Sequence, residues 1–313
     1  RIELIPKFDK DDDGILDKAE RSAARKYVNE QRSGDGGGDR GQRRGRPSSR
    51  GDRGARPDSR DGRGRPAPEP RDFSKAERLE PGNDKDLGTK LYDEGTLRTL
   101  FITFKDNEWK EEMEAFYRTD VAVPADLTVD GKLYKNVGLK FRGNSSYFSV
   151  APGLKRSMNL YLDHKHSDQR LLGYKTLNLL NSNSDPTFMR EVIYSHVARN
   201  YIPAFKGNFV KVVINGESWG VYSHIQQYNK DFLEDNFGTR DGVRWKIGAG
   251  GGGRGNLRYP GEKKEDYTGF QQRTEGKEEA WKELEQFTKL LDETPVEELA
   301  EKLNGRFDID SAM

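Results

Sequence analysis

Apolar and polar residues follow three different patterns along the chain, and each pattern predicts a different kind of segment. Residues 1–31 are rich in charge but carry a helical apolar face, whereas residues 32–71 consist almost wholly of Arg, Gly, Asp, Pro and Ser. No large apolar residue lies between Val28 and Phe73, so this second stretch cannot bury enough surface to offset the loss of chain entropy. Residues 72–313 have the pattern of an ordinary folded domain. We therefore predict a helical segment at 1–31, a disordered linker at 32–71 and a folded domain at 72–313.

Several short segments of the third stretch have the composition and two-residue period of β-strands. The clearest signal is a hairpin, in which two apolar segments flank Asn215-Gly216, a dipeptide that favours a tight turn. The predicted strands cover residues 98–104, 134–141, 158–162, 176–180, 209–214 and 219–225.

Helices are predicted mainly in the second half of this domain, where apolar residues recur every three or four positions. The predicted helices cover residues 187–201, 229–237 and 277–292, and the segment that follows Thr294-Pro295. In the last helix the spacing predicts that Val296, Leu299 and Leu303 are buried. Because strands come first and helices last, we expect an α+β fold with a mixed antiparallel sheet plus helices.

Composition and charge narrow the possible functions. The 313 residues include 54 Lys and Arg against 53 Asp and Glu, a formal net charge of +1, and 34% of all residues are charged. The chain has no cysteine, which excludes disulfides, thiolate zinc sites and cysteine nucleophiles. No apolar run approaches the roughly 20 residues of a transmembrane helix, so we expect no membrane span.

The predicted linker is locally basic, with twelve Arg against six acidic residues between positions 32 and 71. A Gly/Arg-rich tract can bind RNA through phosphate contacts and guanidinium stacking. However, this tract contains no aromatic residue and its acidic residues are interspersed with the arginines. A flexible tether is therefore favoured over a nucleic-acid interface, which stays open as an alternative.

The sharpest chemical motif spans residues 9–20 and fits the twelve-residue EF-hand calcium loop at each diagnostic position. Calcium takes six to eight hard oxygen ligands, and Gly14 stands where the loop must bend sharply. The predicted ligands are Asp9, Asp11, Asp13, the backbone carbonyl of Ile15, Asp17 and Glu20. The alternative is an acidic helix-capping turn, which leaves the mutual repulsion of so many carboxylates unexplained. EF-hands usually occur in pairs, and the chain shows no second loop.

A second motif lies between two predicted strands. A Gly-Asn-Ser-Ser turn at residues 143–146 is followed by Lys155 at the start of the next strand. A strand, a Gly/Ser turn and a basic residue can together form a phosphate cradle. The same residues also fit an ordinary turn and a surface lysine, so the motif alone does not decide between the two.

Six short motifs in fixed order resemble the spore-coat protein H (CotH) kinase family over about residues 96–313. They lie at residues 143–146, 155–160, 177–181, 185–191, 213–222 and 230–233. The resemblance implies an atypical protein-kinase-like fold and transfer of the ATP γ-phosphate to protein Ser, with ATP and Mg²⁺ as cofactors. It also implies a secreted or cell-surface bacterial protein, although no signal-like segment follows Arg1.

The resemblance also implies roles for individual residues. Lys155 would bind phosphate, and Glu191 would be its ion-pair partner, with a surface salt bridge of Glu191 as the alternative. The turn over the nucleotide would comprise Gly143, Asn144, Ser145 and Ser146. This chain departs from the family by carrying Gln226-Gln227 where many members have an acid. The catalytic acids are expected after residues 307–310, and thus C-terminal to Met313, so we expect an incomplete kinase-like domain.

The working hypothesis is therefore a CotH-like, ATP-dependent protein serine kinase with a calcium-binding EF-hand. The rival hypothesis is a non-catalytic calcium-binding surface or matrix protein that uses the kinase-like domain as a binding or structural module.

Overall fold

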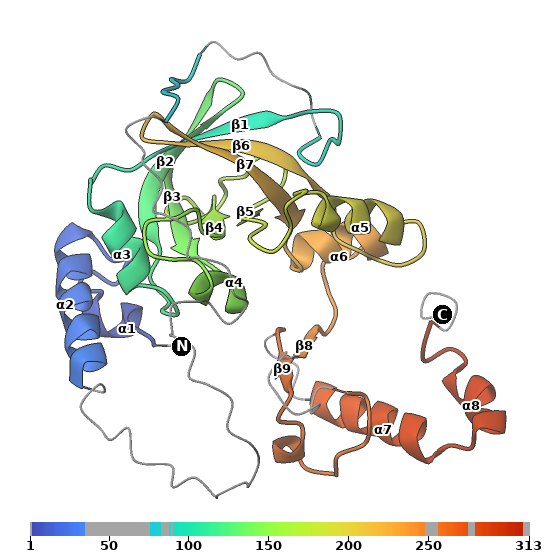
Figure 1. Ribbon diagram of the computed structural model, residues 1–313. Helices are drawn as coiled ribbons and strands as arrows, with labels where there is room; N and C mark the ends of the chain where they lie inside the picture. Colours follow the sequence, from blue (N-terminus) through green and yellow to red (C-terminus); the bar gives the residue numbers. More distant parts are fainter. Residues whose placement is uncertain are drawn as a thin grey trace, which may run out of the picture. The chain divides into compact units, whose positions relative to one another are not determined.

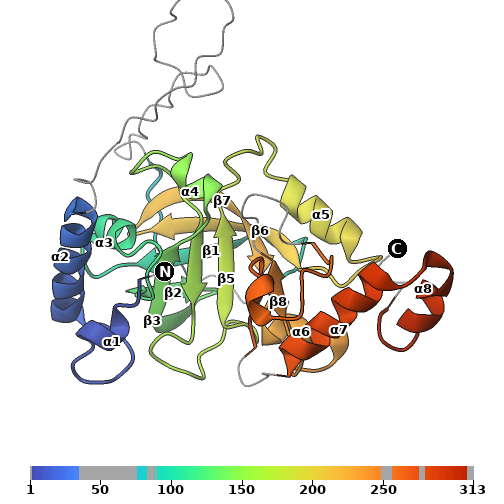
Figure 2. The ribbon, with the colours of Figure 1, turned by 90° about the horizontal axis from the view of Figure 1, so that it is seen from below.

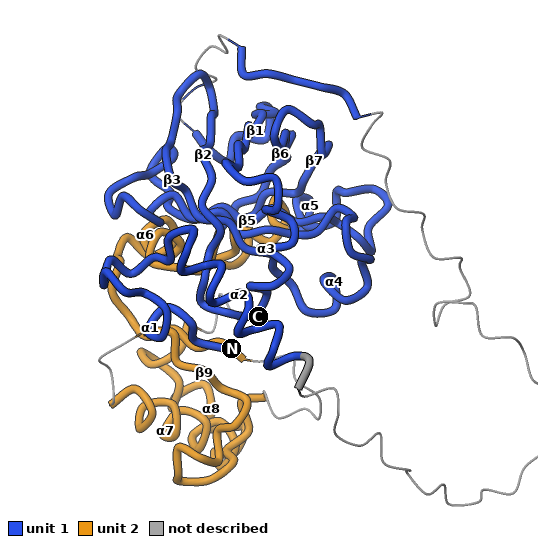
Figure 3. The backbone as a smooth tube through the Cα atoms, turned by 90° about the vertical axis from the view of Figure 1, so that its left-hand side faces the viewer, with its two compact units in different colours: residues 1–194, 206–226 blue, residues 195–205, 227–313 orange. Residues whose placement is uncertain are grey.

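The computed structural model describes residues 2–34, 76–82, 88, 90–247, 256–274 and 279–308. The chain divides into two compact units, coloured separately in Figure 3. Unit 1 comprises Arg1–Tyr194 and Lys206–Gln226, and unit 2 comprises Ser195–Phe205 and Gln227–Met313. The predicted linker lies largely outside the described residues, so its boundaries stay predictions.

Seven strands of unit 1 form a closed barrel in the order β1-β2-β3-β4-β5-β7-β6 (Figure 1). The strands are β1 (Arg98–Thr103), β2 (Val123–Val129), β3 (Lys132–Phe141), β4 (Met158–Tyr161), β5 (Thr176–Leu180), β6 (Gly207–Ile214) and β7 (Glu217–Gln226). All neighbours pair antiparallel except β1 and β6, which pair parallel and close the barrel. The predicted strands are thus confirmed, and β2 is an addition to them.

Side chains that alternate along these strands fill the barrel interior. Leu100, Leu127, Leu139, Leu160 and Leu177 are each 0% exposed and belong to one core cluster. The Asn-Gly turn of the β6–β7 hairpin has positive φ at both residues, +49° at the Asn and +79° at the Gly, as a two-residue hairpin turn requires. The mixed α/β architecture follows the sequence pattern, while its kinase-like character stays a prediction.

The N-terminal helices pack against the barrel within unit 1. α2 (Lys18–Gly34) lies beside α3 (Trp109–Ala115) in both ribbon views (Figures 1 and 2), and α1 (Ile5–Phe8) packs against α2. Side chains of this N-terminal segment join the barrel's core cluster: Leu4, Leu16, Ala24 and Val28, each at most 2% exposed. A buried ion pair between Arg21 and Glu112, at 3.1 Å, fastens α2 to α3. The segment therefore shares its core with the domain that follows it.

Unit 2 contains α6 (Lys230–Phe237), β8 (Trp245–Ile247), β9 (Phe270–Gln272), α7 (Ala280–Glu293) and α8 (Val296–Leu303). Its small core consists of Tyr267, Phe270 and Leu284, with Trp245 and Trp281 packed against them. The Asn229 side chain caps α6 by accepting from two backbone N–H groups, and Gly238, with φ +64°, ends the helix as its sequence predicts.

Two predictions about helices need correction. The helix predicted at 187–201 is α5 (Arg190–Ala198), because Phe188 has φ +62°, a left-handed conformation that an α-helix excludes. Asp185 nevertheless caps it, since its carboxylate accepts from the Arg190 N–H at 2.8 Å. In α8 the predicted burial of Val296 is wrong, because this residue is 81% exposed and only the C-terminal end, at Leu303, is fully buried.

Among the described residues, no helix combines the length and apolar content that a membrane crossing requires.

His224 of β7 is completely buried and stacks on the ring of Tyr92, with centroids 4.6 Å apart. Its Nδ1 lies 2.9 Å from the Asn208 side-chain oxygen and therefore carries the proton in the neutral ring. Burial, reinforced by the charge of Arg98, lowers the pKa of His224 to about 3. We expect this histidine to stay neutral in the folded protein at every pH at which the barrel is stable.

This neutrality has a consequence for stability. The unfolded chain takes up a proton at His224 near pH 6.5, whereas the folded chain does not until about pH 3. Stability should therefore fall by about 1.4 kcal/mol per pH unit through this group as the pH drops below 6.5. ¹⁵N spectra of the imidazole should show neutral-form shifts down to pH 5, with a His224→Gln variant to assign the resonance. Protonated-form shifts above pH 5 would contradict the prediction.

Candidate functional site

The Gly-Asn-Ser-Ser turn follows directly on β3 and is held by residues from outside it. Gly143 has φ +97°, and a Cβ there would overlap the Ser146 side chain, so the position requires glycine. The Tyr117 hydroxyl donates to the Gly143 carbonyl at 2.6 Å, and Arg118 donates to the Asn144 side-chain oxygen at 2.5 Å. Ser145 begins the short helix α4 (Ser145–Phe148). The turn is thus a fixed feature of the barrel's edge.

The ends of three neighbouring strands meet at this edge. β3 ends opposite the start of β4, and β4 starts opposite the end of β5. Asn181, just after β5, joins them, because its side-chain nitrogen donates to the Lys155 carbonyl at 3.0 Å. Its side-chain oxygen also accepts from the Ser157 hydroxyl at 3.0 Å. The structure therefore brings the backbone of Lys155 close to the loop after β5.

The Lys155 side chain points toward β7. Its ammonium group donates to the carbonyl of Val221 and lies 4.2 Å from the ring centroid of Tyr222 and 4.9 Å from that of Phe188. A carbonyl and two π faces stabilise the charged form of the lysine. The predicted phosphate lysine is thus a cation held at the same edge of the barrel.

A cavity of about 300 Å³ opens between the turn and the loop after β5. One of its lining residues, Leu180, is apolar and the other nine are polar or charged. These nine are Ser146, Ser157, Asn181, Ser182, Asn183, Ser184, Asp185, Arg190 and Glu191. Two predicted site residues, Ser146 and Glu191, therefore line one cavity, and Glu191 reaches it from the first turn of α5. Hydroxyl, amide and charged groups in this number suit a polar, hydrogen-bonding ligand.

Arg142, which the sequence did not single out, adds a cation directly before the turn, and its backbone N–H donates to the carbonyl of the lining residue Ser157 at 2.9 Å. The side chain is largely buried, and burial lowers the pKa of its guanidinium, while the negative charge of Glu191 opposes this shift. Within the described part of the chain, its Nη1 is buried and has no hydrogen-bond partner. A buried guanidinium donor normally has a partner, so this atom indicates a missing anionic or polar group.

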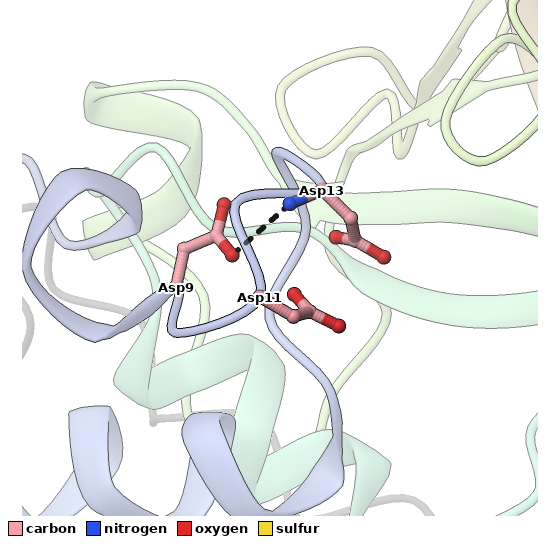
Figure 4. A group of neighbouring side chains, drawn as sticks. All are labelled: Asp9, Asp11 and Asp13. Atoms are coloured by element: carbon pink, nitrogen blue, oxygen red, sulfur yellow. Dashed lines mark hydrogen bonds between the residues drawn. The ribbon is translucent and has the colours of Figure 1, made fainter.

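The acidic loop of residues 9–20 forms a second candidate site (Figure 4). Ligand oxygens of Asp9, Asp11 and Asp13 all lie within 4.8 Å of one another. Asp9 accepts from the backbone N–H of Asp13 at 3.3 Å, the bond drawn in Figure 4, and from that of Gly14 at 2.8 Å. The carboxylate of Glu20 accepts from the Lys10 N–H at 2.7 Å, which draws the two ends of the loop together.

The remaining predicted ligands of this loop also have defined positions. Asp17 accepts from the Glu20 N–H at 2.8 Å, and the Ile15 N–H donates to Asp13 at 2.9 Å. Desolvation, and then the negative charge of Asp13, raises the pKa of Asp11. A hydrogen bond from Lys165 lowers the pKa of Asp13. The cluster therefore concentrates negative charge, and the ammonium group of Lys165 offsets part of that charge at Asp13.

The family model described as CotH kinase protein matches residues 139–313, which is more than half of the chain. The chain belongs to the CotH kinase family. The match begins inside β3 of this CotH family member and includes the turn, Lys155, the loop after β5 and all of unit 2. Membership of a kinase family indicates the use of ATP and a metal in general. No curated protein matches the chain.

Asn181 is the residue on which we expect the geometry of this edge to depend most. Asn181→Asp replaces the donor to the Lys155 carbonyl by an oxygen and should lower the free energy of unfolding by about 1–3 kcal/mol. The matched control is Asn183→Asp on the same loop, which is exposed and should change it by less than about 0.5 kcal/mol. Urea unfolding of the two variants measures the difference, and equal effects would contradict the role given to Asn181.

Proposed function

We propose that this CotH family member binds ATP with Mg²⁺ at the cavity beside the Gly-Asn-Ser-Ser turn and transfers phosphate to protein Ser. The observation that carries the proposal is the polar cavity lined by Ser146 of the turn and by Glu191. Arg142, which directly precedes the turn, adds a cation whose Nη1 is buried and has no partner among the described residues. Phosphate oxygens are the acceptors that a guanidinium group pairs with best. Action outside the cytoplasm of a bacterium is part of the same proposal and rests on resemblance alone.

The residues present fit a nucleotide and a metal ion in their chemistry. Arg142 and Lys155 would supply positive charge to the phosphates, and the hydroxyl group of Ser146 would supply a hydrogen bond. Glu191 offers a carboxylate at the cavity, in keeping with the oxygen ligands that Mg²⁺ prefers. In kinases the metal neutralises charge that develops on the transferred phosphate. Pairing of Glu191 with Lys155 stays a prediction, with a surface salt bridge of Glu191 as its alternative.

The test is ATP–Mg²⁺ binding by the whole chain, measured by calorimetry. Lys155→Ala should weaken binding by about tenfold or more, because a charge-assisted hydrogen bond contributes about 1.5–3 kcal/mol. The matched control is Lys175→Ala, at the start of the neighbouring strand, where the lysine pairs with Asp163 at 3.1 Å. This control should bind ATP as the parent chain does.

Two outcomes would count against these assignments. Equal affinity of the parent and Lys155→Ala chains would show that Lys155 does not contact phosphate. Absence of ATP binding by the parent chain would favour the rival, a non-catalytic binding or structural module.

We further propose that residues 9–20 bind calcium through Asp9, Asp11, Asp13, Ile15, Asp17 and Glu20. Three carboxylates within 4.8 Å are the start of the oxygen cage that calcium takes, and Glu20 already spans the ends of the loop. Lys165, which contacts Asp13 at 2.5 Å, would have to release that carboxylate when the ion binds. A modest affinity is therefore expected.

Calcium titration of the whole chain tests this second site. Glu20→Gln should weaken calcium binding by about tenfold, because it removes a charged ligand that calcium would hold with both oxygens. The control Glu30→Gln alters an exposed acid on the same helix, α2, and should leave the affinity unchanged. No heat and no spectral change at millimolar calcium in the parent chain would rule the site out.

A further inference from the structure

The four residues Tyr117–Asp120 lie within the connection from α3 to β2, and the N-terminal segment contacts them along their length. The Ile2 N–H donates to the Arg118 carbonyl at 3.1 Å, and the Asp120 N–H donates to the Ile2 carbonyl at 3.2 Å. The Asp120 carboxylate accepts from the N–H groups of Leu4 and Ile5, at 2.7 and 3.1 Å. Both ends of the N-terminal segment are engaged, because Arg32, near the end of α2, donates to the Tyr117 carbonyl at 3.0 Å.

The same four residues hold the Gly-Asn-Ser-Ser turn on their other side. Besides the hydrogen bonds from Tyr117 to Gly143 and from Arg118 to Asn144, the rings of Tyr117 and Tyr147 stack with centroids 3.5 Å apart and planes 6° apart. The Arg118 guanidinium also lies 5.1 Å from the ring centroid of Phe148. Tyr117 and Arg118 thus contact both the turn and the helix α4 that continues from it.

Tyr117–Asp120 is itself a stiff connection. Thr119 is 2% exposed, and its hydroxyl donates to the Phe116 carbonyl and accepts from the Val121 N–H. Arg118 has φ +63°, a conformation that its neighbours must enforce. Lys140 of β3 donates to the Asp120 carbonyl at 2.6 Å, which fixes the segment to the strand that leads into the turn. A stiff, fully bonded segment passes a displacement on rather than absorbing it.

We infer that the N-terminal helical segment is a positioning element for the nucleotide site, and that Tyr117 and Asp120 are the positioning residues that connect it to the Gly-Asn-Ser-Ser turn. The inference rests on the proposed nucleotide-binding role of that turn. Residues 2–32 and Tyr117–Asp120 both lie outside the part of the chain that the CotH family model matches.

The test uses two variants of the whole chain, one on each side of the connection. Asp120→Asn weakens the contact with Leu4 and Ile5, and Tyr117→Phe removes the hydrogen bond to Gly143 but keeps the ring. Both should speed amide exchange of residues 143–150 by about threefold or more, while β5 and β7 keep the parent's exchange rates. Both should also weaken ATP–Mg²⁺ binding, by about three- to tenfold.

Two control variants remove equivalent interactions elsewhere in unit 1. Asp126→Asn alters another half-buried aspartate that accepts a backbone N–H, here from Asn136 at 2.8 Å. Tyr174→Phe removes a hydroxyl that accepts from Lys206 at 3.1 Å. Neither should change exchange at residues 143–150 or ATP affinity.

The double variant Asp120→Asn/Tyr117→Phe tests whether both residues affect the turn through the same connection. If both residues act through it, the double variant should be no worse than the poorer single variant, whereas independent effects would multiply. Multiplying effects, or unchanged exchange at residues 143–150 in Asp120→Asn, would overturn the inference. Faster exchange in a chain that binds no ATP would confirm the positioning of the turn and refute the proposed nucleotide binding, so the two failures are distinguishable.

Discussion

The parallel pairing of β1 with β6 is the constraint on which the rest of unit 1 depends. It joins Arg98–Ile102 to Val210–Ile214, more than a hundred residues apart, and turns an open sheet into a barrel without exposed strand edges. Arg98 anchors this joint from a fully buried position by pairing with Asp130 at 2.8 Å. Within the barrel, the antiparallel pairing of β3, β4 and β5 puts the ends of β3 and β5 and the start of β4 at one edge. That pairing brings together the turn, Lys155 and the polar loop after β5.

The N-terminal segment joins the barrel by ordinary core packing and by hydrogen bonds to exposed backbone. Leu4 and Val28, both 0% exposed, share the core cluster with Met113 and Phe116 of the α3 region. Burying side chains of this size contributes about 1.5–3 kcal/mol each, which far exceeds what the surface ion pairs of α2 provide. The acidic loop between α1 and α2 is thereby held against the barrel's core. Any ion that binds the loop therefore acts on a segment already packed on the barrel.

Much of the fold could be predicted from local sequence, because period-two strands, the Asn-Gly hairpin and the caps at Asn229 and Gly238 are local signals. β2 alternates completely, but it was missed because Pro124 and Asp126, residue types that are rare in strands, occupy two of its outward positions. α3 was missed because it is short and lacks a side-chain cap. The closure of β1 on β6 has no local signature, since register between distant strands depends on the whole sheet. The turn and Lys155 lie close together in the sequence and could therefore be predicted as neighbours. The importance of Arg142 could not be predicted, because it depends on the burial of its side chain in the folded protein.

Arg142 and Lys155, which do not themselves line the cavity, differ in what an arriving anion must displace. Lys155 already donates to the Val221 carbonyl and lies against two aromatic rings, so contact with phosphate requires it to give up interactions worth about 1 kcal/mol or more. Arg142 keeps a buried donor with no partner within the described residues, so an anion that reaches it removes an existing desolvation cost. Glu191 lowers this advantage by placing a negative charge nearby, and a metal ion held at the cavity would neutralise that charge. Under the proposed function, a metal-bound anion would therefore be favoured over a bare one at this cavity.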